Sequence, residues 1–355
     1  MTGRDALAVC LLAALAGGCA RKVAEVPRFA LDQCARVTLV DETTGAAITG
    51  AEDLDIDRKV GRIFISAYDR RSAEAAAARR DKIMPQGGVY AIDIAALASG
   101  AASFKLRSLV DPSMIKGGLR PHGIAFDPAS GELAFINRGY AAEGKAWRRQ
   151  IDLITVDPDR PLEAKAARAD CAANDVTAKD GRWAMTLDHG GCGWRAALED
   201  ITGARGGRVI DAAGDEILSG LGFANGAVTA ADGTIVVAAT RERTLRVIDG
   251  EAGATLVKLN AAPDNLTLSD DGRIVAAVHP NLLSLGAQRK LGLGRSPSRV
   301  VEIGLPGGEQ RLLFDDPKNA LISAATVAIR TADLLVIGSV IDAGLVVCRE
   351  RPASP

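Results

Sequence analysis

The feature that most limits the fold of this chain is a short unit that recurs about every 54 residues. In each copy a tight turn is followed by a run of apolar or alternating residues, as at 61–66 (GRIFIS) and 233–238 (GTIVVA). The turns lie at positions 61, 131, 181, 233, 272 and 333, and the last copy lacks the glycine. A glycine turn before β-branched residues is typical of a β-hairpin. Six hairpins at a spacing close to the roughly 40–50 residues of a propeller blade predict one all-β domain, a six-bladed β-propeller.

The segments between these hairpins are compatible with such a ring. We expect further strands at 89–94, 151–156 and 245–249. The stretch 72–80 is rich in alanine and charge and predicts a short surface helix, and 190–207 is expected to carry another short helix. Residues 139–150 are polar with glycine and are expected to form a loop. A pair of β-sandwiches is the alternative architecture, but it does not explain a regular six-fold period.

Composition excludes several classes of function. The 355 residues include 43 Lys and Arg against 44 Asp and Glu, which gives a net charge of −1. Nucleic-acid binding depends on a basic surplus or stripe and is therefore not expected. The 3 histidines leave little material for a His-rich zinc site. The sequence has no Gly-x-Ser-x-Gly nucleophile motif, no P-loop and no dinucleotide fingerprint.

The N-terminal segment has the pattern of an export signal. Residues 6–18 are uncharged and mostly apolar, and they are too few for a spanning helix, which needs about 20. Small residues directly before Cys19 resemble a bacterial lipobox, in which Cys19 would carry the lipid; a plain cleaved signal is the alternative. We therefore expect a signal at 1–18, a linker at 19–33 and the propeller at 34–355. The expected location is the periplasm or the outer membrane as a lipoprotein, with membrane contact only through Cys19.

Export makes disulfides possible, because they persist outside the cytosol. Four cysteines remain beyond the signal and Cys19, namely Cys34, Cys171, Cys192 and Cys348. Four cysteines allow three pairings. The most economical pairing joins Cys171 to its neighbour Cys192, and Cys34 at the start of the folded region to Cys348 near its end.

Polar residues precede the turns at matched distances. Five of the six units place an acid, an amide or a histidine six to nine residues before the turn, namely Glu52, Asp53, His122, Asn174, Asp175, Asn225, Asp264 and Asn265. Equivalent positions of all blades surround the axis of a propeller, so these side chains are expected to converge there. Carboxylate and amide oxygens are the ligands that Ca²⁺ prefers. The sequence therefore predicts calcium on the axis, and the alternative is that these residues only form turns at strand entries.

The ordered set of these motifs resembles the paraoxonase/arylesterase family. The segments that carry the resemblance are 50–56 (GAEDLDI), 121–124 (PHGI), 174–176 (NDV), 223–226 (FANG), 264–265 (DN) and 279–281 (HPN). They occur in the family's order with similar gaps over residues 34–348. Cys34 and Cys348 also match the disulfide that closes the ring in that family.

The resemblance implies two calcium ions in the central tunnel of a six-bladed propeller. It assigns the catalytic ion to Glu52, Asn174, Asn225, Asp264 and Asn265. It assigns the structural ion to Asp53, Asp175 and the backbone carbonyl of Ile124. His122 matches the general base that activates water, and His279 and Phe223 match residues of the substrate pocket. Asp188 and His189 match an acidic–histidine pair of the family, although a loop or core role is the alternative for His189.

One position departs from the family pattern. A second histidine is expected after the asparagine in the strand that follows the Pro-His-Gly segment, but here Asn137 is followed by Arg138. A guanidinium cannot act as a base at neutral pH. A relay of two histidines is therefore not expected, and Arg138 becomes a candidate for binding an anionic substrate.

These observations lead to an expected function. The chain is expected to be a calcium-dependent hydrolase of lactones or aryl esters, in which Ca²⁺ polarises the carbonyl and His122 activates water. Its partner is then a small-molecule lactone or ester. One alternative is a propeller enzyme of the gluconolactonase or strictosidine-synthase type with a single metal. Another is a non-catalytic, calcium-stabilised binding propeller on the cell envelope.

Overall fold

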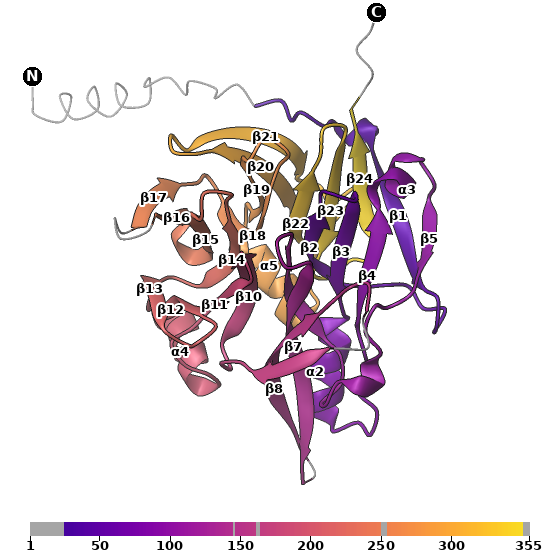
Figure 1. Cartoon of the computed structure of the whole chain (residues 1–355), viewed down its shortest axis with the longest axis vertical. Helices are drawn as coiled ribbons and strands as arrows, with labels where there is room; N and C mark the ends of the chain where they lie inside the picture. The colour runs from indigo at the N-terminus through magenta and orange to yellow at the C-terminus, as the bar shows by residue number, and fades with distance from the viewer. Residues whose placement is uncertain (1–24, 145, 161–163, 250–253, 351–355) are drawn as a thin grey trace, which may run out of the picture.

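Six β-sheets surround a central axis in the computed structural model, which describes residues 25–144, 146–160, 164–249 and 254–350 (Figure 1). Blade 1 contains β2 (Ala51–Asp57), β3 (Arg62–Ala67) and β4 (Gly88–Asp93). Blade 2 contains β6 (Pro121–Asp127), β7 (Glu132–Glu143), β8 (Ala146–Val156) and β9 (Lys165–Arg168). Blade 3 contains β10 (Ala173–Lys179), β11 (Arg182–Leu187), β12 (Gly207–Asp211) and β13 (Glu216–Leu221). The predicted six-bladed propeller is confirmed.

The other three blades complete the ring. Blade 4 contains β14 (Ala224–Thr229), β15 (Ile235–Ala239), β16 (Thr244–Ile248) and β17 (Ala254–Lys258). Blade 5 contains β18 (Ala262–Leu268), β19 (Ile274–His279), β20 (Ser298–Gly304) and β21 (Glu309–Asp316). Blade 6 contains β22 (Ala325–Arg330), β23 (Leu334–Ser339), β24 (Leu345–Arg349), β1 (Cys34–Asp41) and β5 (Ser103–Leu106). Each recurring turn of the sequence connects the innermost strand of a blade to its second strand. Each innermost strand also contacts the innermost strands of the two neighbouring blades, in the order β2, β6, β10, β14, β18 and β22 around the axis.

Both ends of the described chain meet in blade 6. Strand β1 pairs antiparallel with β24, and Cys34 lies directly opposite Cys348 in this register. The two cysteines form a disulfide, and a second one joins Cys171 to Cys192, so both predicted pairings are confirmed. Strand β5 follows blade 1 in the sequence but pairs parallel with β1 in blade 6. Strand β1 near the start of the described chain therefore lies in one sheet between β24, near its end, and β5, which follows blade 1. This arrangement joins the first and last blades.

Removing the Cys34–Cys348 bond with Cys34→Ser and Cys348→Ser is expected to lower the free energy of unfolding by about 2–5 kcal/mol. The bond spans 314 residues, and a longer closed loop restricts the unfolded chain more. The matched control is Cys171→Ser with Cys192→Ser, which opens a bond spanning 21 residues and should cost less. Urea titration of both pairs measures this, and a larger loss in the control pair would contradict the closure argument.

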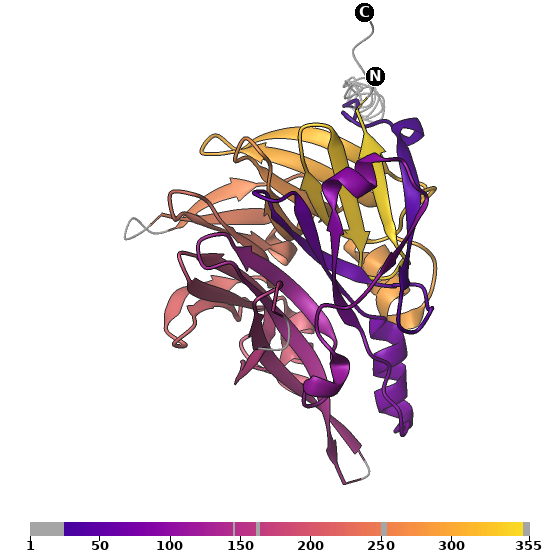
Figure 2. The ribbon, with the colours of Figure 1, turned by 45° about the vertical axis from the view of Figure 1, so that its right-hand side comes forward.

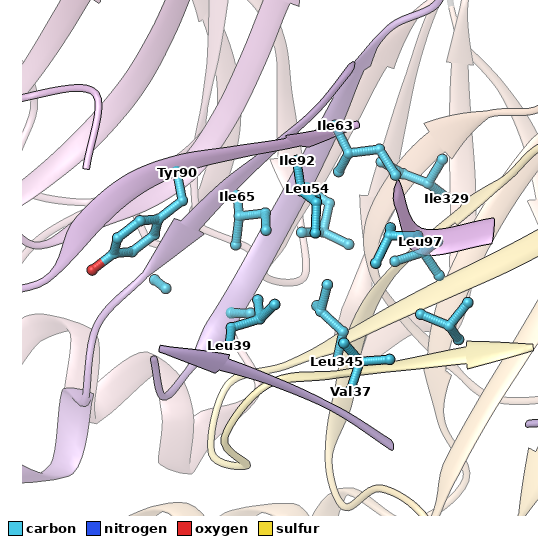
Figure 3. Packing of buried hydrophobic residues seen from close by; sticks show 14 of the residues in the cluster. Val37, Leu39, Leu54, Ile63, Ile65, Tyr90, Ile92, Leu97, Ile329 and Leu345 are labelled. Carbon is cyan, nitrogen blue, oxygen red and sulfur yellow. The ribbon is translucent and has the colours of Figure 1, made fainter. Parts of the chain in front are cut away.

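A hydrophobic core fills the interface between blades 6 and 1 (Figure 3). Alternate residues of a strand point to one face, so Leu54 of β2 and Ile63 and Ile65 of β3 project from blade 1. They pack against Leu345 of β24 and Ile329 of β22 from blade 6. Comparable clusters of buried aliphatic side chains lie in the other blades and between them. These interfaces fix the angle between blades and hence the positions of the axial side chains.

The innermost strand of every blade contains a register shift at the residues nearest the axis. The shifts lie between residues 51 and 53, 121 and 124, 173 and 176, 224 and 227, 263 and 266, and 325 and 327. A β-bulge interrupts the regular alternation of side chains and redirects a residue. The polar residues singled out at matched distances before the turns lie at or beside these shifts. The matched spacing in the sequence therefore reflects an irregularity repeated in the innermost strand of each blade. These polar residues do more than form turns where strands begin.

Close approach of neighbouring bulges depends on glycine at two positions. A Cβ atom on Gly123 of β6 would lie 2.3 Å from Asp175 Oδ1 and 2.4 Å from Asp175 Cα in β10. A Cβ atom on Gly226 of β14 would lie 2.5 Å from Asn265 Cα in β18. No side chain fits at either place unless the strands separate.

Gly123→Ala is expected to lower the free energy of unfolding by about 1–3 kcal/mol or more, because backbone atoms of β10 would have to move. Gly307→Ala is the matched control, since a Cβ atom there meets nothing within 4 Å. Thermal or urea unfolding of the two variants compares them. Equal stability of Gly123→Ala and the control would show that β6 and β10 do not approach as described.

Two short helices confirm the sequence analysis, and one expected loop is wrong. Helix α2 (Arg70–Arg79) begins at Asp69, whose side chain accepts a hydrogen bond from Ser72 N, and α4 (Trp194–Thr202) lies within 190–207. Residues 139–150 are not a loop, because β7 and β8 pair as far as Glu143 and Ala146. The hairpin projects beyond the blade (Figure 2), where polar side chains can face solvent. Tyr140 and Trp147 of the hairpin belong to the same apolar cluster as Ala76 of α2. The other helical segments are α3 (Ile94–Ala98), α5 (Leu282–Gly286), η1 (Leu31–Gln33), η2 (Pro112–Met114), η4 (Thr240–Glu242) and η6 (Ala287–Leu291).

The N-terminal predictions fall mostly outside the described residues. The signal at 1–18 and the lipidation site Cys19 lie there, whereas 25–33, the described part of the expected linker, packs on the propeller. Phe29 is fully buried, and the backbone N–H groups of Arg28 and Phe29 donate to Leu312 O and Leu313 O. No helix within the described ranges has the length and apolar character needed to span a membrane. The two disulfides are typical of proteins that fold in an oxidising compartment outside the cytosol.

Candidate functional site

A cavity of about 1270 Å³ opens along the axis at one end of the propeller. Its floor consists of the bulged ends of the innermost strands. Its walls come from insertions between strands, namely the start of α2, the β7–β8 hairpin, α4 and the α5–η6 segment. Helix α2 and the hairpin project from the end of the molecule opposite the described chain termini (Figure 2). The cavity is therefore built from the repeated strand ends of the blades at its base and from insertions between strands at its mouth.

Most of the predicted site residues meet in this cavity. The residues that line it include Glu52, His122, Asn174, Asn225, Asp264, His279, Phe223, Arg138, Asp188 and His189. Asn265 does not line the cavity but is 1% exposed and hydrogen-bonded to Glu52. Asp53, Asp175 and Ile124 are buried away from the cavity lining. Residues that are up to 227 positions apart in the sequence thus converge at one place, as the repeat predicts.

Glu52 lies at the centre of one group of contacts. Its Oε2 atom lies 2.8 Å from His122 Nδ1, and its Oε1 atom accepts a hydrogen bond of 3.4 Å from Asn265 Nδ2. Its backbone carbonyl accepts hydrogen bonds from Asn265 Nδ2 and from Thr326 Oγ1 of blade 6, at 3.0 and 2.7 Å. Burial alone would raise the pKa of Glu52, but His122 and Arg138 outweigh this effect and lower the pKa to about 2. The carboxylate is therefore ionised at neutral pH. Glu52 therefore connects blades 1, 2, 5 and 6 around a buried negative charge.

Asp264 lies at the centre of a second group. One carboxylate oxygen accepts a hydrogen bond from Asn225 Nδ2, and the other lies 2.5 Å from His279 Nε2. Asn174 belongs to neither group, because its Nδ2 atom donates to Asp188 Oδ2 at 3.1 Å. Since the amide nitrogen of Asn174 is engaged in this way, its oxygen remains for a ligand in the cavity.

The five residues predicted to hold the catalytic calcium fit such an ion chemically. They supply two carboxylates and three amides, with no sulfur, and every one of them is buried. Two of their buried oxygen atoms, Glu52 Oε2 and Asn265 Oδ1, have no hydrogen-bond donor of normal geometry among the described residues. Buried oxygens without partners carry a desolvation cost that a cation would offset. An amide can also present its oxygen in place of its nitrogen after a half-turn, which would place Asn225 Oδ1 beside the Asp264 carboxylate.

Asp53 and Asp175 form a deeper pair of acids. Asp53 accepts hydrogen bonds from Leu54 N and, across the blade boundary, from Ile124 N, each at 2.9 Å. Asp175 makes the equivalent bonds to Val176 N and to Ala227 N of blade 4, each at 2.7 Å. Burial raises the pKa of both acids, and the Asp175 charge raises that of Asp53 further. Each carboxylate thus joins two blades, and the pair favours either a shared proton or a bound cation.

His122 is not an ordinary exposed imidazole. Burial and then the Arg138 charge lower its pKa from about 6.5 to about 3, against the opposing effect of Glu52. The ring is therefore neutral at physiological pH. It can accept a proton in the ground state, although it is a weaker base than an exposed histidine.

His189 lies buried in the loop after β11, as a loop or core role requires, and it also lines the cavity. Its Nδ1 atom lies 2.6 Å from Asp188 Oδ1, and its Nε2 atom lies 3.3 Å from Asp200 Oδ1. Asp188 also binds the amide of Asn174, so His189 is linked to a predicted calcium ligand through one carboxylate. The ring packs edge-on against Phe223 at 5.3 Å between centroids. The two flanking acids raise the pKa of His189 against the effect of its burial.

Sequence reasoning missed most of the cationic residues of the cavity. Besides Arg138, the described lining residues include Arg70, Arg148, Arg149, Arg168, Arg241, Arg289 and Lys290. These residues come from different insertions and follow no common offset from the turns. Thr326 of blade 6 also lines the cavity, but the sixth unit places Ala324 and Ala325 directly before it, where the other five units have an acid, an amide or a histidine. The only signal in the sequence was the replacement of an expected histidine by Arg138.

Comparison with known proteins supports the fold. No protein-family model matches this sequence, and no curated protein is detectably similar to it. A structural-genomics target that carries a gluconolactonase assignment superposes with a TM-score of 0.50 at 12% identity, covering 89% of this chain and 91% of that one. A protein of unknown function from Bacteroides thetaiotaomicron gives a TM-score of 0.52 at 9% identity, covering 89% and 75%. Virginiamycin B lyase from Staphylococcus aureus gives 0.49 at 10% identity, covering 89% and 98%. The chain is similar in architecture to propellers of this kind, and its resemblance to the paraoxonase family stays a prediction.

Proposed function

We propose that this protein is a calcium-dependent hydrolase of lactones or esters that works in the axial cavity. One observation carries the proposal: acidic and amide side chains from several blades converge, buried, at the floor of a cavity large enough for a small molecule. Cavities of about 300–1,000 Å³ or more with a few convergent polar groups are typical ligand sites. The superposed structures support the architecture at 12% identity or less and do not bear on the reaction.

The proposed division of labour follows from the contacts. A Ca²⁺ ion held by Glu52, Asn174, Asn225, Asp264 and Asn265 would supply Lewis-acid polarisation of the substrate carbonyl. Glu52 and Asp264 place their carboxylates at the floor, where each lies next to a histidine. The Asp188 carboxylate fixes the amide of Asn174. These residues hold the floor of the cavity rigid, which is what positions a reacting carbonyl.

His122 is the proposed base. It lies beside Glu52, it lines the cavity, and it is neutral at physiological pH, so it can take a proton from an attacking water molecule. Arg138 lines the cavity with it but cannot accept a proton at neutral pH, which excludes a relay of two histidines through that position. His122 alone therefore provides base catalysis in this proposal.

Two alternatives remain as competing proposals. A single-metal propeller enzyme of the gluconolactonase type would use the catalytic ligand set alone; we favour a second ion at Asp53 and Asp175 because their paired buried carboxylates need a proton or a cation. A non-catalytic binding propeller would keep both ions without turnover. The presence of a neutral histidine at the cavity floor favours the enzyme.

A turnover assay tests the proposal. The full chain is incubated in calcium with a panel of γ- and δ-lactones, sugar lactones and 4-nitrophenyl esters, and release of acid is followed. The proposal predicts turnover of at least one class that Glu52→Gln reduces by about 10²-fold or more. An exposed acid outside the cavity lining provides the matched control, Glu216→Gln, which should retain wild-type activity. Calcium binding without hydrolysis of any member of the panel would instead favour the binding propeller.

A further inference from the structure

The charge of the cavity differs sharply from that of the whole chain. The protein has a net charge of −1, yet the described residues that line the cavity include eight arginines and lysines against four acids, Glu52, Asp188, Asp200 and Asp264. The acids lie at the floor or beside His189, whereas the cations come mostly from the insertions that form the walls. A concave site lined by one sign of charge focuses its field on a ligand of the opposite sign.

Several wall cations pair with a nearby carboxylate. Arg241 and Lys290 share Asp200, Arg168 lies 3.5 Å from Asp152, and Arg148 lies 3.5 Å from Glu143. Their charges are thus partly compensated within the wall. The remaining arginines of the lining are Arg70, Arg138, Arg149 and Arg289.

Arg138 has no ion-pair partner among the described residues, and the charges of Glu52 and Asp188 act on it only from a longer distance. Its side chain is in the cavity wall although the residue is only 5% exposed. The guanidinium donates one long hydrogen bond, 3.5 Å from Nη2 to Ala173 O, and its Nε atom has no partner among the described residues. Within the described chain no carboxylate lies within 4.0 Å of it. A buried guanidinium with unused donors is costly unless a ligand completes it.

Arg70, Arg149 and Arg289 all interact with Glu74. Glu74 Oε1 lies 3.1 Å from both Arg70 Nε and Arg149 Nη2, and Arg289 also interacts with Glu74 electrostatically. The Arg70 charge, followed by burial, lowers the pKa of Arg289. Burial, followed by the same Arg70 charge, lowers the pKa of Arg138 to about 10. The arginines therefore repel one another within one wall while remaining charged at neutral pH.

We infer that Arg138, Arg70 and Arg289 form a binding site for an anionic group, a carboxylate or a phosphate, that the ligand carries in addition to its reacting carbonyl. Arginine donors form a planar fork that matches carboxylate and phosphate oxygens. Arg138 interacts electrostatically with both Glu52 and His122, so the anionic group would lie next to the proposed reaction centre. The inference rests on the proposed function for one point only, namely that the ligand is hydrolysed. The substrate class it names is an anionic lactone or ester.

Binding can be measured without any hydrolysis. Succinate and inorganic phosphate, as probes of the two anion types, are titrated into the full protein by calorimetry. Arg138→Gln and Arg289→Gln are each expected to weaken binding of at least one probe about 10- to 100-fold, as expected when a hydrogen bond to a charged group is lost. Arg138→Lys should recover only part of this affinity, because it restores the charge and not the fork.

The matched control is Arg182→Gln, which removes one exposed positive charge from β11 outside the cavity lining. It should leave the affinity for both probes unchanged. Circular dichroism and unfolding curves check that the cavity variants fold, which is expected because Arg138 has only one weak hydrogen bond to lose. Equal affinity in the wild type, Arg138→Gln and Arg289→Gln, or no measurable binding of either probe, would overturn the inference.

A pair of esters separates this inference from the proposed function. 4-Nitrophenyl acetate is neutral, and 4-nitrophenyl hemisuccinate carries a carboxylate on the acyl side. The inference predicts at least about a 10-fold higher kcat/KM for the hemisuccinate, lost in Arg138→Gln mainly through KM. Hydrolysis of both esters with no preference and no anion binding would refute the anion site and leave the hydrolase standing. Anion binding that depends on Arg138, with no hydrolysis of either ester, would keep the site and count against the hydrolase.

Discussion

Asn265→Ala is expected to reduce lactone or ester hydrolysis by about 10²–10³-fold when calcium is limiting. Asn265 is 1% exposed, donates to both Glu52 O and Glu52 Oε1, and has an Oδ1 atom with no partner among the described residues. Its loss removes a proposed calcium ligand and also releases the Glu52 side chain. Steady-state kinetics at several calcium concentrations should show partial recovery as calcium rises, because the other ligands remain.

The control for this variant is Asn260→Ala, an exposed position just before β18 and outside the cavity lining, which should keep wild-type rates. Unfolding curves of both variants separate lost catalysis from lost folding. Activity of Asn265→Ala within a factor of about two of the wild type at every calcium concentration would remove this residue from the proposed site.

His122→Gln is expected to lower kcat by about 10²–10⁴-fold, the range in which a positioned general base contributes. Glutamine is close in size and can still bond to Glu52, so the floor of the cavity should persist and calcium affinity should change little. A remaining, calcium-dependent rate is expected, since carbonyl polarisation does not need the histidine.

His279→Gln provides the comparison for His122→Gln, because His279 is also buried, lines the cavity and pairs with a carboxylate. If only His122 acts as the base, His279→Gln should lose less kcat than His122→Gln. Full turnover in His122→Gln would exclude it from the mechanism, and a larger loss in His279→Gln would transfer the role of base to the second histidine–carboxylate pair.

Much of the fold was predictable because it repeats. A turn after every innermost strand leaves a periodic signal, and the bulge in each of these strands places its polar residues at a nearly constant distance from that turn. The convergence of Glu52, Asn174 and Asp264 follows from this repetition alone. Disulfide partners were predictable too, since closure of a ring brings its two ends together.

The parts that do not repeat were not predictable. Beyond the blade the β7–β8 hairpin mixes Tyr140 and Trp147 with glycine and charged residues, so residues 139–150 show no regular strand alternation. Arg70 and Arg289 reach the cavity from helical insertions whose orientation depends on packing against other blades. The lowered pKa of His122 depends on burial and on Arg138 together, which no local pattern encodes.

Metal content measured alongside activity tests the central claim most directly. The full chain is treated with a chelator, its bound calcium is measured by mass spectrometry of the elements, and hydrolysis of the best substrate is followed as calcium is added back. The account predicts two bound ions before treatment, loss of activity and of thermal stability on removal, and recovery of both with calcium. Magnesium should restore neither fully, because it requires a tighter octahedral site. Undiminished hydrolysis by protein shown to be free of metal would contradict the account.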